Sequence, residues 1–282
     1  MKRTYFMKIS CILILIAIIA FICVFSVSVF AEEDDTIYYV GGNTEANTFG
    51  NVNYYKNYPE GSRIVQSEYV GLPNGCPLYY NNNQTLTNCC ANVTGAMLIG
   101  FYDRYIEDLI PNVSTYRAEY NMYAPMGWIS NEIQSLISDL YTRMGTNSIK
   151  PGTSESQFFS GMEQFCNAKN LNIAKESVKY NDGLNLNSVK QALNNNKPVV
   201  VFASKHNTIS ISSNVINIVC SDIPHIFVAS GYSHYKVYSH NNLLLDEFYV
   251  LRASKGIAGA VDAIIVDSDY FTIDNAYIFE IR

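Results

Sequence analysis

Apolar residues follow three different patterns along this chain. An almost unbroken apolar run comes first, over residues 9–30. Apolar side chains then recur every three or four residues, which predicts helices. After residue 197 they form short continuous runs instead, which predict buried strands. Helices followed by strands indicate an α+β fold with two segregated parts. The predicted helices lie within 90–101, 129–144, 155–168 and 187–194, and the predicted strands within 198–202, 208–219, 226–229, 248–251 and 277–281.

The first apolar run has the features of an export signal. Lys2, Arg3 and Lys8 precede it, and Ala31 follows it just before four acidic residues. This arrangement is typical of a secretory signal peptide, residues 1–31, cleaved after Ala31. The run is also long enough to cross a bilayer as an uncleaved anchor. We therefore expect a secreted or cell-surface protein that meets the membrane only through this segment.

A polar stretch follows the signal. Residues 32–64 are rich in Asn, Tyr and Gly and have few aliphatic side chains. Such a composition fits either a pro-segment or a disordered linker. The sequence therefore predicts an N-terminal extension over 32–64 and a folded domain over 65–282.

Charge excludes one class of partner. The chain has a net charge of −6, and loss of residues 1–31 removes three basic residues and no acidic ones, which makes it −9. An acidic chain without a basic stripe is repelled by phosphate backbones. We expect no nucleic-acid partner, and the sequence leaves the oligomeric state open.

Five cysteines remain after residue 31, which is an odd number. In an exported protein an odd count leaves at least one free thiol. Cys76 and Cys89 are close enough in sequence to form a disulfide or to remain separate thiols. No Cys-x-x-Cys occurs and the four histidines are scattered, so the sequence predicts no metal and no organic cofactor.

Cys90 is the strongest candidate nucleophile. It opens the first predicted helix, where unpaired N–H groups and the positive end of the helix dipole favour a thiolate. His225 begins an apolar strand and could serve as a base, and Gln84 could donate to an oxyanion. Each residue alone is also compatible with a structural role, since free cysteines are commonly buried. The other histidines, among them His206 and His234, are interpreted as solvated loop residues.

Taken together, these residues resemble a known family. Gln84 is followed after five residues by Cys90, which begins a run of small residues ending at Met97. An aromatic-Asp pair follows at 102–103, and the strand at His225 leads into Gly-Tyr at 231–232. The pattern is similar to papain-like cysteine peptidases, in particular the bacterial domains related to bacteriocin-processing peptidases. The resemblance covers roughly residues 65–282.

This resemblance implies a fold and a function. A helical lobe would precede an antiparallel sheet or barrel lobe, with the active site between them. Cys90 would attack a peptide or protein substrate, and His225 would accept the thiol proton. Gln84 and the Cys90 N–H would bind the oxyanion. The resemblance thus implies an exported thiol peptidase of the hydrolase class.

Two departures from the family pattern leave alternatives open. Ala91-Asn92 stands where the family commonly has Gly-Pro, and Ala253 occupies the position of the residue that orients the imidazole. Alanine cannot hydrogen-bond the ring, so the third member is either absent or another residue. The alternatives are a catalytically impaired binding module at the cell surface, or another Cys-His acyl-transfer enzyme such as a transglutaminase-like protein or a cell-wall amidase. The candidates for the third member are Asp246, Ser254 and Asp267.

Overall fold

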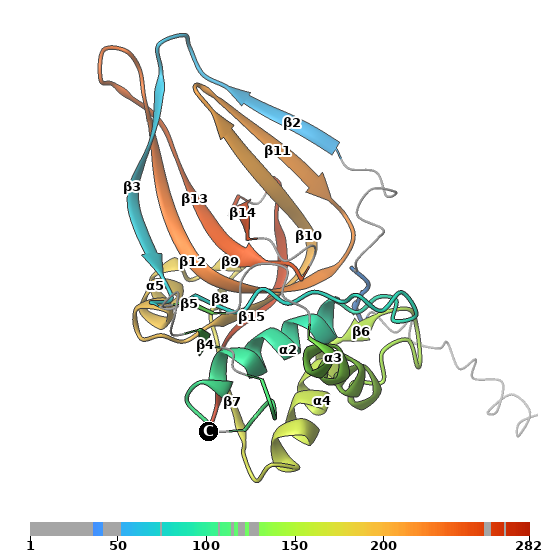
Figure 1. Ribbon diagram of the computed structural model, residues 1–282. Helices are drawn as coiled ribbons and strands as arrows, with labels where there is room; N and C mark the ends of the chain where they lie inside the picture. The colour runs from blue at the N-terminus through green and yellow to red at the C-terminus, as the bar shows by residue number, and fades with distance from the viewer. Residues whose placement is uncertain are drawn as a thin grey trace, which may run out of the picture. The chain divides into compact units, whose positions relative to one another are not determined.

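Antiparallel strands and helices alternate along the chain in the computed structural model, and strands precede as well as follow the described helices (Figure 1). Residues 37–282 form one unit. The predicted signal peptide and its cleavage point after Ala31 lie outside the described residues. Among the residues described, no helix is both long and apolar enough to cross a membrane. The structure describes residues 36–41, 52–73, 75–106, 108–113, 116–117, 122–123, 130–256, 261–267 and 269–282.

A nine-stranded antiparallel sheet organises the unit. Its main path is β14-β13-β12-β10-β11-β2, while β15 pairs with β10 and β7, and β3 pairs with β12. Short strand pairs β1-β6, β4-β5 and β8-β9 lie outside this sheet. The strands of the large sheet are β2 (Val52–Asn57), β3 (Arg63–Gly71), β7 (Ile173–Ser177), β10 (Val199–Ser212), β11 (Val215–Ser221), β12 (His225–Tyr238), β13 (Leu244–Ser254), β14 (Asp262–Ile265) and β15 (Thr272–Ile281). The short strands are β1 (Tyr38–Tyr39), β4 (Tyr116–Arg117), β5 (Met122–Tyr123), β6 (Thr153–Ser154), β8 (Lys179–Tyr180) and β9 (Gly183–Leu184).

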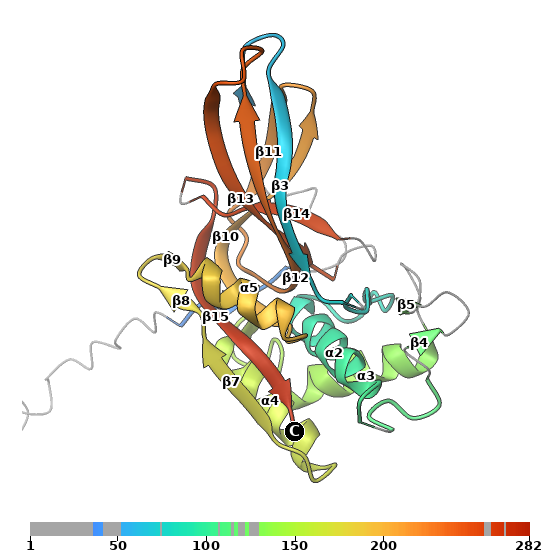
Figure 2. The same ribbon diagram turned by 90° about the vertical axis from the view of Figure 1, so that its left-hand side faces the viewer.

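Helix α2 (Cys90–Asp103) is the central helix of the unit. Every residue from Cys90 to Tyr102 is buried, as expected of a helix that is apolar on all sides. It packs against β12 and against α3 (Asn131–Arg143), and α3 packs in turn against α4 (Glu155–Asn167). The three helices lie together near one end of β12, whereas α5 (Leu186–Asn194) lies beside β3 (Figure 2).

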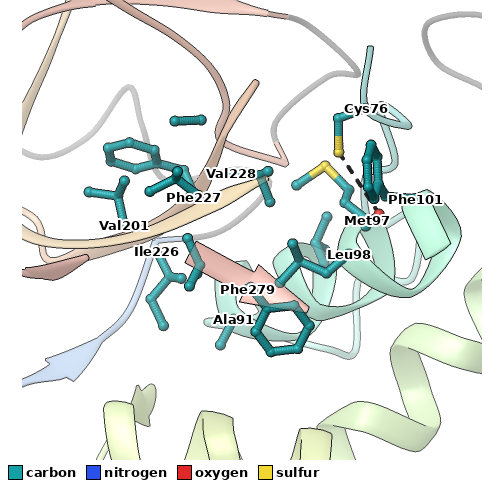
Figure 3. Packing of buried hydrophobic residues seen from close by; sticks show 14 of the residues in the cluster. Cys76, Ala91, Met97, Leu98, Phe101, Val201, Ile226, Phe227, Val228 and Phe279 are labelled. Carbon is teal, nitrogen blue, oxygen red and sulfur yellow. Dashed lines mark hydrogen bonds between the residues drawn. The ribbon is translucent and has the colours of Figure 1, made fainter. Parts of the chain in front are cut away.

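The contact between α2 and β12 builds the core around the candidate site. Figure 3 shows side chains of α2 and β12 gathered with Phe279 of β15 in one buried cluster. The first residues of β12 lie between β10 and the helix, and the pairing Ala203 with His225 begins the ladder. Thr94 of α2 donates a hydrogen bond to the Ile226 carbonyl at 3.1 Å. The helix and the strand are therefore joined close to Cys90 and His225.

The α+β prediction and the four predicted helices are confirmed. The predicted strand over 208–219 is wrong as one strand, because it spans the end of β10, a turn and the start of β11. The predicted order of helices before strands is also wrong, because β2 and β3 of the large sheet precede α2.

The predicted boundary between residues 64 and 65 falls inside β3 and separates no structural units. Strand β2 pairs with β11, and Ile64 of β3 pairs with Val237. These two strands are largely exposed, so their sequence lacks the apolar alternation that marks a half-buried strand.

A substitution at Gly161 of α4 tests how closely this helix packs against Met144, which follows α3. A Cβ at this position would overlap the Met144 side chain and lie 2.9 Å from the Met144 backbone nitrogen. We expect Gly161→Ala to lower the free energy of unfolding by about 1–3 kcal/mol, measured by urea denaturation, because backbone atoms cannot yield cheaply. In Gly183→Ala, the matched control, the nearest atom is 3.9 Å away. An equal loss of stability in both variants would contradict this account.

Candidate active site

Cys90 is the first residue of α2, as the sequence predicted. Its side chain is buried among residues of the core, and the residue is 2 % exposed. The Cys90 N–H donates a hydrogen bond to the Gly41 carbonyl at 2.9 Å. The first N–H groups of a helix have no partner within the helix, so they are free to bind a carbonyl or an oxyanion. At Cys90 this N–H is already bonded to the carbonyl of Gly41 in the same chain.

The thiol is neutral in this state. Burial raises the pKa of Cys90 to about 12, although the backbone N–H groups of Ile226, Ala91 and Gly41 act in the opposite direction. Desolvation of the charged form therefore outweighs the donors around the sulfur. A thiolate at neutral pH requires a change in what covers Cys90.

His225 begins β12 and lies against Gly41. The residue is 1 % exposed, and its ring nitrogen Nε2 lies 2.8 Å from the Lys255 carbonyl oxygen. A carbonyl can only accept, so Nε2 carries the hydrogen in the neutral ring and Nδ1 is left as the acceptor. This is the tautomer that a base must have if it is to take a proton at Nδ1.

The group that orients the imidazole is a backbone atom, which sequence reasoning missed. Ser254, one of the three candidates, is buried beside Val228 of β12, but its Oγ accepts from the Gly256 N–H at 3.5 Å. The ring instead donates to the next residue's carbonyl, at Lys255. Every residue has a carbonyl, so no residue type signals this role in a sequence.

Asp246 and Asp267, the other two candidates, are wrong for this role. Asp246 pairs with Val237, 12 residues along β12 from His225. At a rise of about 3.3 Å per residue, this places the carboxylate on the order of 40 Å from the imidazole. Asp246 accepts from the Tyr58 hydroxyl at 2.7 Å, and Lys56 lies 3.9 Å from Asp246 and 3.5 Å from Asp267. Both carboxylates therefore belong to an ion-pair cluster at the far end of the sheet.

The structure does not place Gln84 as an oxyanion donor. Its side chain is exposed and makes none of the hydrogen bonds found among the described residues. The buried amide of this loop is Asn81, which donates to the carbonyls of Asn83 and Leu86 at 2.8 and 3.0 Å. Asn81 also hydrogen-bonds the Cys89 thiol. Several amides follow one another in this loop, so sequence spacing alone could not tell which one turns inward.

Gly41 contacts both of the candidate catalytic residues. Its N–H and that of Val40 donate to the Pro224 carbonyl at 3.3 and 3.0 Å, beside His225. A Cβ built on Gly41 would overlap the His225 ring at Nδ1. Within the described residues, the Cys90 thiol and the His225 ring share no direct hydrogen bond. The two side chains thus converge on one glycine.

His206 is a second buried imidazole at the site. It belongs to β10, and its ring centroid lies 5.2 Å from that of His225. Its Nδ1 is buried with no hydrogen-bond partner in the described part of the chain. The interpretation of His206 as a solvated loop residue was wrong, because the loosely alternating stretch around it gave a weak strand signal. His234 likewise lies within β12 and not in a loop.

Both imidazoles are kept neutral by burial. Burial lowers the pKa of His225 to about 4, while the hydrogen bond to Lys255 acts in the opposite direction and the Lys255 charge lowers it further. The pKa of His206 lies well below its usual value because of burial and then the charges of His225 and Lys255. Burial thus leaves His225 able to accept a proton but not to hold one at neutral pH.

This burial predicts a loss of stability in acid. The unfolded chain binds protons at histidine below about pH 6.5, whereas His225 in the folded chain resists them until about pH 4. The free energy of unfolding should therefore fall as the pH is lowered through this window, by on the order of 3 kcal/mol for His225. Urea denaturation at pH 7, 5.5 and 4 measures it. His225→Gln should show a shallower fall, and the same slope as wild type would refute the assignment.

The other cysteines in the described part of the chain form no competing disulfide. All five described cysteines are free and buried. Cys76 lies against the Met97 carbonyl at 3.9 Å and is not bonded to Cys89 (Figure 3). Burial raises the pKa of the Cys89 thiol to about 11. No group of three or more His, Cys, Asp or Glu side chains in the described part of the chain could hold a metal ion.

The chemistry available at this site is that of a nucleophile, a base and a backbone donor. Cys90 supplies the thiol and an N–H at a helix start, and His225 supplies an imidazole whose Nε2 is held by a carbonyl. No family model, curated protein or solved structure gives a significant match to the chain. The functional argument therefore rests on this geometry.

Proposed function

We propose that this protein is an exported cysteine peptidase with a papain-like arrangement of its active site. One observation carries the proposal: a peptide carbonyl, that of Gly41, accepts a hydrogen bond from the Cys90 N–H while the same glycine lies against Nδ1 of His225. A scissile carbonyl needs this relation to a nucleophile, a base and an oxyanion donor. The α+β fold and the helix start at Cys90 also support it.

The reaction follows from the positions of these groups. When a substrate carbonyl takes the place of the Gly41 carbonyl, Nδ1 of His225 accepts the Cys90 proton and the sulfur attacks the carbonyl carbon. The Cys90 N–H binds the resulting oxyanion. Nδ1 then returns the proton to the leaving amine, and water hydrolyses the thioester by the same proton transfers in reverse order.

The Lys255 carbonyl takes the part that a side-chain amide or carboxylate plays in many such sites. It holds the Nε2 hydrogen, so that Nδ1 faces the reacting atoms in the basic tautomer. A neutral carbonyl stabilises the imidazolium less than a carboxylate would. We therefore expect a peptidase in which the group that orients the imidazole is in place but stabilises the imidazolium less than a carboxylate would.

A substrate panel tests the proposal and separates its nearest rivals. Wild-type protein is incubated with a peptide library, with peptidoglycan fragments, and with a glutamine peptide plus a labelled amine. New peptide termini found by mass spectrometry would support a peptidase. Products only from peptidoglycan would indicate a cell-wall amidase, and amine incorporation alone would indicate a transglutaminase-like enzyme. A lack of products from all three would contradict Cys-His acyl transfer.

A binding module at the cell surface is the second candidate, and one feature favours it. A hollow of about 460 Å³ is lined by Tyr180, Lys190, Tyr232 and Tyr249, among other residues. The Lys190 ammonium lies 4.6 Å from the centre of the Tyr232 ring. Lys190 is also paired with Glu68 at 2.8 Å and Tyr232 is buried, so the rings open to a glycan or an aromatic peptide side chain are those of Tyr180 and Tyr249. Binding to cell-wall glycans that is lost in Tyr249→Ala and retained in Cys90→Ala would favour this function.

A further inference from the structure

We propose that Lys255 is a positioning residue whose ammonium fixes the backbone carbonyl that holds the imidazole of His225. The ammonium is bound by Thr208 of β10 and Asp262 of β14. We refer to Lys255, Thr208 and Asp262 as the lysine clamp. The kinetic consequence of this inference rests on the proposed peptidase function, whereas the state of the imidazole can be measured without any reaction.

The strand ladder ends just before the orienting carbonyl. Ser254 is the last residue of β13 and pairs with Val228 of β12. Lys255 follows it and belongs to none of the strand pairs in the described part of the chain, yet its carbonyl lies 2.8 Å from Nε2 of His225. Holding a backbone group outside a ladder costs conformational entropy. Other contacts therefore have to set the direction of this carbonyl.

The Lys255 ammonium supplies such contacts on two other strands. It donates a hydrogen bond to Thr208 Oγ1 at 2.6 Å and lies 3.4 Å from Asp262 Oδ2. The side chain of Lys255 is 12 % exposed and that of Asp262 is 22 % exposed, so water and salt screen this ion pair less than one at the open surface. Both ends of residue 255 are thus held, the carbonyl at the imidazole and the ammonium between β10 and β14.

The two strands that bind the ammonium are also joined to each other. Asn207, beside Thr208, is buried. It donates to the Ile265 carbonyl at 3.0 Å and accepts from the Ile265 N–H at 2.9 Å. Ile265 ends β14, which begins at Asp262, and β10 pairs in turn with the first residues of β12. The partners of the ammonium therefore belong to the same framework as the imidazole.

The residue after Lys255 fixes the turn from a different direction. The Gly256 N–H donates to Ser254 Oγ at 3.5 Å, and its φ of +69° lies in the region that favours glycine. A Cβ on Gly256 would lie 2.6 Å from Cγ1 of Val93, which belongs to α2. The turn therefore contacts the helix of Cys90 at residue 256 and the two partner strands at residue 255.

The clamp lies near both buried imidazoles. Thr208 and His206 are two positions apart on β10, so their side chains share a face of the strand. Burial is the largest cause of the lowered pKa of His225 and of His206, and the charge of Lys255 lowers both further. Lys255 thus acts on His225 in two ways, because its carbonyl holds Nε2 and its ammonium opposes protonation of the ring.

A spectroscopic experiment on the full chain tests the clamp without any reaction. Lys255→Met keeps an unbranched apolar side chain and removes the ammonium. A heteronuclear NMR spectrum of the histidine rings at neutral pH shows which nitrogen of His225 carries the hydrogen, with His225→Gln to assign the signal. We expect the hydrogen on Nε2 in wild type. In Lys255→Met we expect a larger share on Nδ1 and faster exchange of the Nε2 hydrogen with water.

The kinetic expectation is a loss in kcat rather than in KM. Lys255→Met should lower kcat for peptide hydrolysis by about 10²-fold, which is the effect of misplacing a catalytic group by about 1 Å. KM should stay within a few-fold of wild type, because the ammonium contacts Thr208 and Asp262 and not the substrate. Lys255→Arg retains a cation that can bind both partners, so it should recover most of kcat and the wild-type spectrum.

Two further comparisons separate positioning from general stability. Thr208→Val removes the hydroxyl acceptor at constant shape and should change the spectrum and kcat in the same direction as Lys255→Met, whereas Thr208→Ser should not. Lys197→Met is the matched control, since it removes a lysine bound to Glu280 at 2.8 Å, outside the clamp. It should keep the wild-type spectrum and kcat. Thr208→Val leaves the ion pair in place, so it carries the test if Lys255→Met does not fold.

The outcomes distinguish this inference from the proposed function. A wild-type spectrum and a wild-type kcat in Lys255→Met and Thr208→Val would show that the clamp does not position the imidazole. An equal loss of kcat in Lys197→Met would attribute the effect to stability and would also overturn the inference. If wild type cleaves no peptide, the peptidase function fails. The tautomer of His225 in the variants then still decides whether the clamp holds the ring.

Discussion

Replacing Cys90 with alanine is expected to lower kcat/KM for a peptide substrate by at least about 10⁴-fold, because no other group can form the thioester. Wild type and Cys90→Ala are purified and assayed in the same way, so that the Cys90 thiol is the difference between them. Hydrolysis of a fluorogenic peptide, chosen from the library results, gives kcat/KM directly.

Cys89→Ala is the matched control for this experiment. Cys89 is the adjacent thiol, equally buried, and it precedes the helix. Loss of the Cys89 thiol should leave kcat/KM within a few-fold of wild type, because it is the Cys90 N–H, and not that of Cys89, that contacts the Gly41 carbonyl. If Cys89→Ala abolished activity and Cys90→Ala did not, the nucleophile would be Cys89. Unchanged activity in both would remove the thiol from the mechanism.

Replacing His225 with alanine is expected to lower kcat/KM by about 10²–10⁴-fold, the usual contribution of a positioned acid-base group. The loss should be smallest at alkaline pH, where hydroxide can deprotonate the thiol without the imidazole. Alkylation of Cys90 by iodoacetamide should show the same dependence. Alkylation should be faster in wild type than in His225→Ala until the pH is high enough for hydroxide to deprotonate the thiol.

His240→Ala is the matched control for His225→Ala. His240 is exposed in a turn after β12. It should retain wild-type kcat/KM and wild-type alkylation of Cys90. A Cys90 thiol that reacts only at alkaline pH in every one of these proteins would show that no Cys90–His225 ion pair forms, and the binding function would become the better explanation.

Local sequence signals account for the two residues that matter most. Cys90 was found because helix periodicity begins there, and His225 because an apolar strand begins there. Both signals depend on neighbours within a few residues. The prediction of the third member failed because it depends on long-range pairing. The register between β12 and β13 determines whether Asp246 or the Lys255 carbonyl lies at the imidazole, and residues within a few positions do not fix that register.

The sequence by itself determined the α+β plan, the helix that begins at Cys90 and the strand that begins at His225, because the periodicity of apolar residues is local. Only the tertiary structure showed that the Lys255 carbonyl holds the imidazole, that His206 is buried beside it and that Gly41 contacts both candidate catalytic residues. Lys255 and Gly41 lie 30 and 184 positions along the chain from His225, and His206 belongs to a neighbouring strand of the same sheet. They depend on backbone atoms and on a glycine without a side chain, which no pattern of residue types can distinguish.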